Sequence, residues 1–379
     1  MAATYEVNLY INGLLIGDVR ELAQDLKWVR RRTKVGADEI DFTLNDVKFN
    51  EWCIERGTDI NTMLKPIGLE CRIKRNGVDI VGGFLATMPS YSPLQTSANL
   101  QMRFDGYLNL LNGVYLYNAN NQLPLGSVTG RLHTLINNFV TTANTRSTNA
   151  GKGYGFVYNG GSTLASVTNT FDGYKTLKEF ICDRSDNTEG AGPFDVIFFS
   201  DKKYQIWAQG DYGDTITDWT ARYPADIDQT SAMSITADEI SGFASSVIAI
   251  GSGEVSSDPN KNTAIKKFTQ NNNKTKEYGY YETMIQESSI SLQNTLNQKA
   301  ATALYNASKV IWEPKITLTG RMVSPTPTGN KKIWLCDIIT IENTEDLTGM
   351  TNGQFRVNEL DVSISANGSE TITPVLERV

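Results

Sequence analysis

The chain has 379 residues, of which 42 are acidic and 35 are lysine or arginine, so the formal net charge is −7. Hydrophobic residues make up 40% and charged residues 20% of the sequence, which is typical of a globular protein and argues against a disordered tail. An acidic chain without a long basic run is a poor general binder of nucleic acid, because that affinity comes mainly from neutralising phosphates. The length suits two to four domains better than one core.

The sequence also excludes several classes of segment. No run of about 18 apolar residues occurs, so no membrane-spanning helix is predicted. Residues 1–9 lack a basic stretch followed by an apolar one, so we expect no secretory signal. The four cysteines, Cys53, Cys71, Cys182 and Cys336, are spaced too widely for a zinc knuckle or a disulfide framework. We expect them to be reduced thiols.

The first 120 residues indicate short strands and one helix. Two Asn-Gly pairs, at 12–13 and 76–77, predict hairpin turns because both residues tolerate the left-handed backbone that such turns require. Asn45 or Asp46 is placed to cap a short helix that contains Phe49 and Trp52. The predicted strands are residues 5–10, 14–16, 27–34, 39–44, the two halves of 69–84, and 99–105.

The most basic stretch lies within the third of these strands. Residues 27–34 read Lys-Trp-Val-Arg-Arg-Arg-Thr-Lys, which could suggest contact with nucleic acid. The alternation equally fits a strand with one charged face, and we favour a solvated or subunit-facing strand. Arg30, Arg31 and Arg32 are therefore the candidate interface residues.

The spacing of apolar residues changes near Ser127. Apolar residues at 132, 135, 136, 139 and 140 follow helical spacing, with Ser127 or Thr129 as the expected cap. Residues 141–170 are rich in Asn, Thr and Gly and are predicted to form a loop. A second helix, capped by Asp172, is expected to bury residues 177, 180 and 181. Residues 194–199 and 204–207 predict another hairpin.

Strands dominate again after Ser234. Residues 247–250 form an apolar strand, 258–276 are predicted to be a mobile loop, and 288–310 show the spacing of a helix that Pro314 ends. Short strands are expected at 316–318, 332–335, 338–341, 355–360 and 362–364.

These elements predict an α+β, β-rich fold in which tube-like β-barrel domains flank a small inserted α/β module. The expected division is a β-barrel domain over 1–120, the inserted α/β domain over 121–225, and a second β-barrel domain with the C-terminal strands over 226–379.

Catalytic patterns are sparse. His133 is the only histidine. A metal site built from several histidines is therefore excluded, and a Ser-His-Asp arrangement would have to use this one residue. A pairing of His133 with Cys182 has no supporting pattern. Gly251-Ser252-Gly253 follows an apolar strand but lacks the remaining residues of a phosphate-binding loop. No catalytic, cofactor-binding or metal-binding residue is predicted.

One region allows a second interpretation of the function. Asp211, Asp214 and Asp218 lie beside Trp207, Tyr212 and Trp219. Paired carboxylates next to aromatic rings are used by proteins that cleave or bind glycans. The alternative is an exposed acidic loop between strands, anchored by aromatic side chains, and we favour that interpretation.

The order of elements resembles the hub family of phage tails and related injection machines. The resemblance is carried by Asp41-Phe42-Thr43-Leu44-Asn45-Asp46, by the 70–84 hairpin ending in Gly-Gly-Phe-Leu, by Val247–Gly251, by Tyr278–Glu282, and by the helix with Leu296–Ala300. It spans most of the chain as a pattern of elements.

This resemblance implies a structural role in the virion tail, after synthesis in the host cytoplasm. Hub proteins are homotrimers whose paired barrels adapt a six-fold tube to a three-fold tip. The implied partners are the distal tail or tail tube protein, the tape measure protein and a tip, spike or receptor-binding component, with DNA passing through unbound. The chain ends at Val379 and is expected to lack a lytic extension, so no enzymatic activity and no cofactor are expected. The alternatives are a glycan-active or glycan-binding tail component and the hexameric distal tail or tube ring protein.

Overall fold

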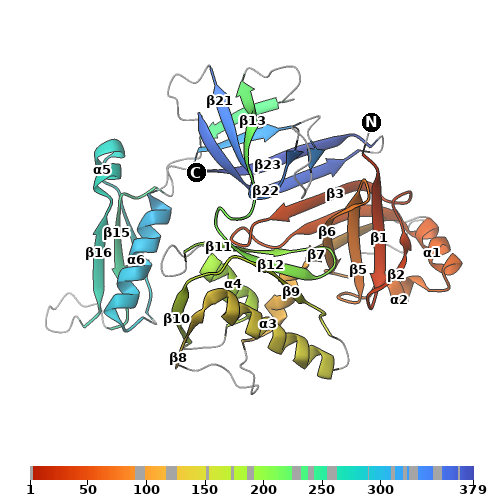
Figure 1. Ribbon diagram of the computed structural model, residues 1–379, viewed down its shortest axis with the longest axis horizontal. Coiled ribbons are helices and arrows are strands. Elements are labelled where there is room, and N and C mark those ends of the chain that lie inside the picture. Colours follow the sequence, from red (N-terminus) through yellow and green to blue (C-terminus); the bar gives the residue numbers. More distant parts are fainter. Residues whose placement is uncertain are drawn as a thin grey trace. The chain divides into compact units, whose positions relative to one another are not determined.

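The computed structural model describes most of the chain (Figure 1). The described residues are 3–89, 99–116, 126–150, 153–171, 175–185, 192–223, 232–237, 243–253, 263–288, 290–308, 312–318, 322–323, 332–344, 352–365 and 368–379. They divide into two compact units. The main unit comprises Met1–Asp186, Gly190–Ile235 and Pro314–Val379, and the small unit comprises Asn187–Glu189 and Thr236–Glu313. No described helix is both long and apolar enough to cross a membrane.

The main unit is organised around an 11-stranded sheet. Its strands are β1 (Tyr5–Ile11), β2 (Leu14–Asp18), β3 (Gln24–Arg31), β4 (Glu39–Asn45), β5 (Leu69–Arg75), β6 (Val78–Leu85), β7 (Asn99–Gly106), β13 (Thr215–Tyr223), β21 (Ile338–Asn343), β22 (Gly353–Ile364) and β23 (Glu370–Arg378). The hydrogen-bonded order is β13-β21-β22-β3-β4-β7-β6-β5-β1-β2, with β23 paired to β22. The sheet therefore combines strands from both ends of the sequence.

The two predicted Asn-Gly hairpins are present. Asn12 and Gly13 have φ of 51° and 79°, and Asn76 and Gly77 have φ of 50° and 78°. Left-handed backbone at both central positions is the geometry of the two-residue turn that matches strand twist. Local sequence thus determines where β1 turns into β2 and where β5 turns into β6.

Two short helices and a 3-10 segment accompany the N-terminal strands. They are α1 (Asp46–Glu55), α2 (Ile60–Met63) and η1 (Tyr107–Gly113). Asn45 caps α1 by accepting a hydrogen bond from the Lys48 backbone N–H at 3.1 Å. Asp59 does the same for α2 through the Thr62 N–H at 2.9 Å. Such caps satisfy amide groups that a helix start leaves unpaired.

The core of the sheet is aromatic. Phe42 and Phe104 on neighbouring strands stack at 5.6 Å between ring centroids. Trp28 of β3 lies 6.3 Å from Trp334, which precedes β21. All four side chains belong to one buried cluster that draws on both ends of the chain, so the two ends share a hydrophobic core.

The middle part of the main unit is an α/β module. It contains β8 (Gly126–Arg131), α3 (Leu132–Asn149), β9 (Val157–Gly161), β10 (Ser166–Phe171), α4 (Leu177–Ser185), β11 (Phe194–Phe198) and β12 (Lys203–Ala208). The strands pair as β10-β8 and β11-β12-β9. The apolar face predicted for α3 is buried, and its Phe139 meets Phe180 of α4 edge to face at 5.7 Å. The module therefore has a hydrophobic core of its own.

Two predictions for the module were wrong. Residues 141–170 were expected to be a loop, but α3 continues to Asn149 and β9 and β10 follow. Ser127 and Thr129 were expected to cap the helix, but they lie in β8, and Arg131 at the N-cap makes no side-chain cap. Asp172, the cap expected for the second helix, lies outside the described residues.

The small unit is a three-stranded sheet with a helix. Its elements are β15 (Ser246–Ile250), β16 (Lys266–Gln270), α5 (Asn272–Tyr278), β17 (Glu282–Gln286) and α6 (Gln293–Ala307). The strand order is β16-β15-β17, and Ala249 packs with Leu296 and Ala300 of α6. The loop predicted over 258–276 was wrong in its described part, because β16 and α5 occupy it.

The remaining elements are short or lie where the chain passes between units. They are β14 (Ala232–Ala237), β18 (Trp312–Thr317), β19 (Met322–Val323) and β20 (Lys332–Ile333). The predicted α+β, β-rich class is confirmed. The division into 1–120, 121–225 and 226–379 groups residues differently from the two compact units, and as a description of folding domains it stays a prediction.

Candidate functional site

The basic run of β3 is where the main sheet, the module and the C-terminal strands meet. Strand alternation would place neighbouring arginines on opposite faces. Arg30 and Arg32 are 2% and 1% exposed, whereas the Arg31 side chain keeps 23% of its surface. The structure thus brings all three candidate interface residues together, with two of them directed into the protein.

Arg30 is held inside the sheet. Its guanidinium lies 3.1 Å from an Asp38 carboxylate oxygen, donates to the Ile80 carbonyl at 3.3 Å, and lies over the Trp334 ring at 5.8 Å. Burial raises the pKa of Asp38, although the neighbouring Arg30 acts in the opposite direction. The contacts fix the loop before β4 against the core.

Arg31 belongs to a row of charges that crosses the sheet. Its Nε donates to Glu359 of β22 at 2.7 Å and its Nη1 donates to Glu39 of β4 at 2.9 Å. Glu39 also pairs with Arg103 of β7 at 3.0 Å. Opposite charges on adjacent strands stabilise pairing across the sheet, so this row links four strands through β3.

Arg32 joins the main sheet to the module. Its Nε lies 3.1 and 3.0 Å from the two carboxylate oxygens of Asp195, and its Nη2 lies 2.9 Å from one of them. Asp195 belongs to β11 and is 3% exposed. A two-point, charge-assisted contact of this kind combines strength with a fixed orientation.

The same cluster reaches the last strand. One Glu377 oxygen of β23 accepts from Lys34 at 2.6 Å, from Asn358 at 3.1 Å and from Arg32 at 3.4 Å. The thiol of Cys336 lies 3.9 Å from an Asp195 oxygen. We call Arg32, Lys34, Asp195, Arg356, Asn358 and Glu377 the arginine cluster.

The cluster gives Arg30, Arg31 and Arg32 roles within the chain. Sequence alone could not reveal them, because Asp195 and Glu377 lie far away in sequence and carry no motif. Whether the three arginines also contact another subunit stays a prediction, and Arg31 is the most exposed of the three.

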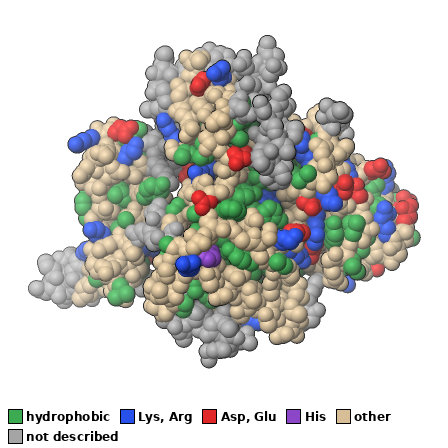
Figure 2. Space-filling view, viewed as in Figure 1, with side chains coloured by type: hydrophobic (Ala, Val, Ile, Leu, Met, Phe, Trp, Pro, Cys, Tyr) green, Lys and Arg blue, Asp and Glu red, His purple; other side chains and the backbone are tan. Residues whose placement is uncertain are grey.

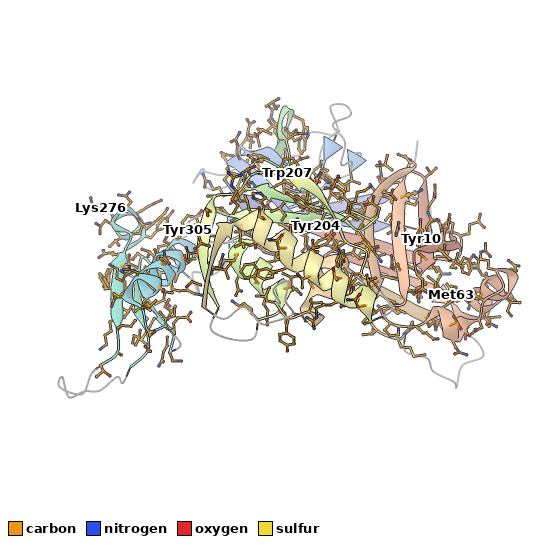
Figure 3. All side chains as sticks on the ribbon, turned by 60° about the horizontal axis from the view of Figure 1, so that its bottom comes forward. Tyr10, Met63, Tyr204, Trp207, Lys276 and Tyr305 are labelled. Atoms are coloured by element: carbon orange, nitrogen blue, oxygen red, sulfur yellow. The ribbon has the colours of Figure 1, made fainter. Side chains whose placement is uncertain are left out.

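The acid and aromatic residues at 207–219 mostly serve packing. Trp207 and Tyr204, labelled in Figure 3, come from β12 and contribute to different cores, Trp207 to that of the sheet and Tyr204 to that of the module. Tyr212 lies 5.9 Å from Trp207 and accepts a hydrogen bond from the Trp334 indole at 3.2 Å. Trp219 is 6% exposed. These rings offer no open platform for a sugar.

Among the acids of this region, the structure describes a carboxylate contact for Asp211. Asp211 accepts a hydrogen bond from the Ser162 hydroxyl at 2.5 Å. The backbone N–H of Asp214 donates to Asp337 at 2.9 Å. The side chain of Asp218 lies outside the described residues. Asp211 and Asp214 lie in the loop between β12 and β13, whereas Asp218 lies within β13 and not in the expected loop. The choice between a structural loop and a glycan site stays a prediction.

His133 lies at the molecular surface, where it is purple in Figure 2. Its Nδ1 accepts from the Leu164 backbone N–H at 3.1 Å, which requires that nitrogen to be unprotonated. Partial burial and the nearby Arg131 lower the histidine pKa. Among the described residues, no three His, Cys, Asp or Glu side chains gather closely enough to hold a metal ion.

The glycines at 251–253 do not form a phosphate cradle. The Gly251 N–H donates to the Ile265 carbonyl at 2.8 Å, and the Ser252 N–H donates to the Ile290 carbonyl at 2.7 Å. Since these amides already donate to backbone carbonyls of neighbouring segments, they are unavailable to an anion.

A polar groove of about 890 Å³ lies beside the module, lined among others by Lys65, Glu70, Arg72 and Lys202. Lys202 pairs with Glu70 at 2.5 Å, and Arg72 lies over the Tyr10 ring at 4.2 Å. The first contact ties β5 to the turn between β11 and β12 and the second ties β5 to β1, so the groove walls are themselves a structural junction.

The architecture was compared with known sequences and solved structures. No protein-family model and no curated protein matches the sequence. Among solved structures, the 43 kDa tail protein of prophage MuSo2 from Shewanella oneidensis matches with a TM-score of 0.62 and 12% identity, covering 99% of this chain and 98% of that one. A tail protein from Neisseria meningitidis MC58 matches with a TM-score of 0.59 and 12% identity, covering 99% and 96%.

The chain has the fold of phage tail proteins. The resemblance that the order of elements indicated is confirmed at this level. Because the match spans nearly the whole of both chains, the tail-protein fold here includes the main sheet, the module and the small unit.

Proposed function

We propose that this protein is a structural hub of a phage tail tip or baseplate. In this role it forms a trimeric ring that joins the tail tube or distal tail ring to the tip and contributes to the conduit for DNA or effector. The observation that carries the proposal is the nearly full-length match to two tail proteins.

The use of charged residues supports a mechanical role. The buried arginines of the β3 run, Arg30 and Arg32, pair with carboxylates and join strands that are distant in sequence. Neither the aromatic residues at 207–219 nor His133 has the arrangement of a reaction centre. We therefore propose that the chain itself is not an enzyme.

The proposed partners follow from the proposed place in the virion tail. They are two further copies of the chain, a distal tail or tail tube protein, a tape measure protein, and a tip, spike or receptor-binding component. DNA would pass without specific binding. Each copy carries a formal charge of −7, and acidic groups facing a conduit would repel rather than retain DNA.

The decisive experiment is the mass of the purified full-length chain in solution, measured by light scattering and combined with negative-stain images. A hub predicts a three-fold ring with three times the 41.9 kDa chain mass. A six-fold ring would instead support the distal tail or tube protein. A monomer that releases reducing ends from cell-wall or surface glycans would support the glycan-active alternative and reject the hub.

A further inference from the structure

Arg356 of β22 is a buried cation that forms no hydrogen bond or ion pair with the described residues. The residue is 7% exposed. Within the part of the chain that the structure describes, its guanidinium makes no hydrogen bond and no ion pair, and its Nε is completely buried without an acceptor. Burying an unpaired charge is costly, so such residues are normally paired.

The nearby carboxylates are committed to other cations. Asp195 receives the two-point contact from Arg32, at 2.9 to 3.1 Å. Glu377, which lies opposite Arg356 on β23, directs one oxygen to Lys34, Asn358 and Arg32. The arginine cluster thus contains three cations and two carboxylates.

The lowered pKa of Arg356 agrees with this imbalance. Burial is its main cause and repulsion by Arg32 adds to it, while the more distant attraction of Asp195 and Glu377 offsets only part of this lowering. A further buried carboxylate, Asp337, accepts the backbone N–H groups of Trp334 and Asp214 at 2.7 and 2.9 Å. Because none of these carboxylates forms an ion pair with Arg356, an additional negative charge beside its guanidinium would be favourable.

The free end of Arg356 keeps limited contact with solvent. Only Nε is among its fully buried, unpartnered atoms, so the two terminal nitrogens keep contact with solvent. One of them would lie 4.0 Å from a Cβ added at Gly210, in the loop between β12 and β13. Gly210 is itself exposed. The absence of a side chain at this position leaves the approach to the guanidinium open.

We propose that Arg356 binds an acidic side chain from a second copy of the chain. The inference rests on the proposed ring and adds one contact to it: an Asp or Glu of the neighbouring copy inserts beside Gly210 and pairs with the terminal nitrogens of Arg356. A carboxylate matches the two-pronged end of a guanidinium. A second copy is a suitable source, because acidic residues outnumber lysine and arginine, 42 to 35.

The test compares wild type with Arg356→Leu in the full-length chain. In dilute solution, where subunits are separate, replacing an unpaired buried cation by an apolar side chain is expected to raise Tm by about 2 °C. At higher concentration the same variant is expected to associate at least tenfold more weakly in sedimentation equilibrium. Stability of the subunit and stability of the assembly should therefore change in opposite directions.

Two matched variants serve as controls. Arg222→Leu removes the same charge from an exposed ion pair, in which the Arg222 and Glu342 side chains are 53% and 48% exposed. This variant is expected to change neither the Tm of the subunit nor the strength of association. Arg356→Lys keeps the charge but loses the two-pronged geometry, so its association should lie between wild type and Arg356→Leu.

Each outcome is decisive. If wild type is trimeric and Arg356→Leu associates equally well, the inference is rejected while the proposed ring stands. If Arg356→Leu lowers the Tm of the dilute subunit, Arg356 has a partner within its own chain and the inference is also rejected. If wild type stays monomeric at every concentration, the proposed ring fails and the inference fails with it.

Discussion

Arg32 and Asp195 form a two-point ion pair across 163 residues of sequence, with the shortest contact at 2.9 Å. The two side chains keep 1% and 4% of their surface. Through this pair the third strand of the main sheet is joined to the first strand of the β11–β12 hairpin. The pair thus fixes how the module sits on the sheet within the main unit.

Asp195→Asn should be the most damaging single change in the arginine cluster. It leaves Arg32 buried without its carboxylate partner, and it also removes the attraction of Asp195 for the neighbouring Arg356. Removing one partner of a buried pair typically costs about 3–5 kcal/mol, and we expect a loss in this range in urea unfolding. Arg32→Met should cost less, because it removes one of the two cations. An unfolding midpoint of Asp195→Asn equal to that of wild type would contradict this account.

Gly213 should tolerate no side chain. Its φ is +90°, and an added Cβ would lie 2.4 Å from the carbonyl carbon and oxygen of Cys336. Gly213→Ala therefore combines backbone strain with a collision against the main chain, and we expect a loss of more than about 3 kcal/mol.

Gly210→Ala is the matched control for that change. Its φ is +98°, but the nearest atom to an added Cβ is an Arg356 nitrogen at 4.0 Å. The only remaining cost is that of placing an alanine in left-handed backbone, which is about 1 kcal/mol. Denaturant midpoints of the two variants measured side by side decide the point, and equal losses would show that the Cys336 contact is unimportant.

Local signals explain what the sequence could predict. The Asn12-Gly13 and Asn76-Gly77 turns depend only on residues that accept positive φ, and both are present. The helix over Leu132 and its apolar neighbours was visible because its buried face repeats with helical spacing. These features need no knowledge of distant contacts.

Distant pairing explains what the sequence could not predict. Trp28 of β3 pairs with Val362 of β22, and neither residue carries a mark of its partner. The arginine run looked like an exposed face because its acceptors, Asp195 among them, lie elsewhere in the chain. The strand β9, Val157–Gly161, was missed because its Asn and Gly residues are typical of loops and none of its side chains is fully buried.

Asp41 should make stability depend on pH. Burial and the neighbouring Glu39 raise the pKa of Asp41 from 3.8 to about 6. Because the folded state holds this proton more tightly than the unfolded state, stability is lost as the pH rises from about 4 to about 6 and stays lower above that.

Asp41→Asn removes this dependence. The variant should be more stable than wild type above pH 6, by about 1 kcal/mol after solvent screening of a half-buried carboxyl, and equally stable near pH 4. Tm measured from pH 4 to 8 tests the prediction. A variant that is less stable than wild type at pH 7.5 would show that the attraction of Asp41 to Lys27 and Arg103 outweighs its repulsion by Glu39.

Cys182 should be the first thiol to react in the folded protein. Cys53, Cys71 and Cys336 are 0%, 0% and 3% exposed, whereas Cys182 on α4 is only partly buried, with its sulfur 3.5 Å from the Thr33 carbonyl oxygen. Burial raises the pKa of each of the four thiols, and that of Cys53 to about 11. Since the thiolate is the reactive form, labelling at neutral pH should be slow and should accelerate as the pH rises.

Mass spectrometry of maleimide-labelled protein shows which cysteine reacts first. One equivalent should add at Cys182, and the other three sites should label only on the timescale of unfolding, because their sulfurs are enclosed by the core. Cys182→Ser should abolish the early phase and leave the later one unchanged. Labelling of Cys71 before Cys182 would contradict this prediction. It would mean that β5 separates from its neighbours β1 and β6 more readily than α4 exposes its partly buried thiol.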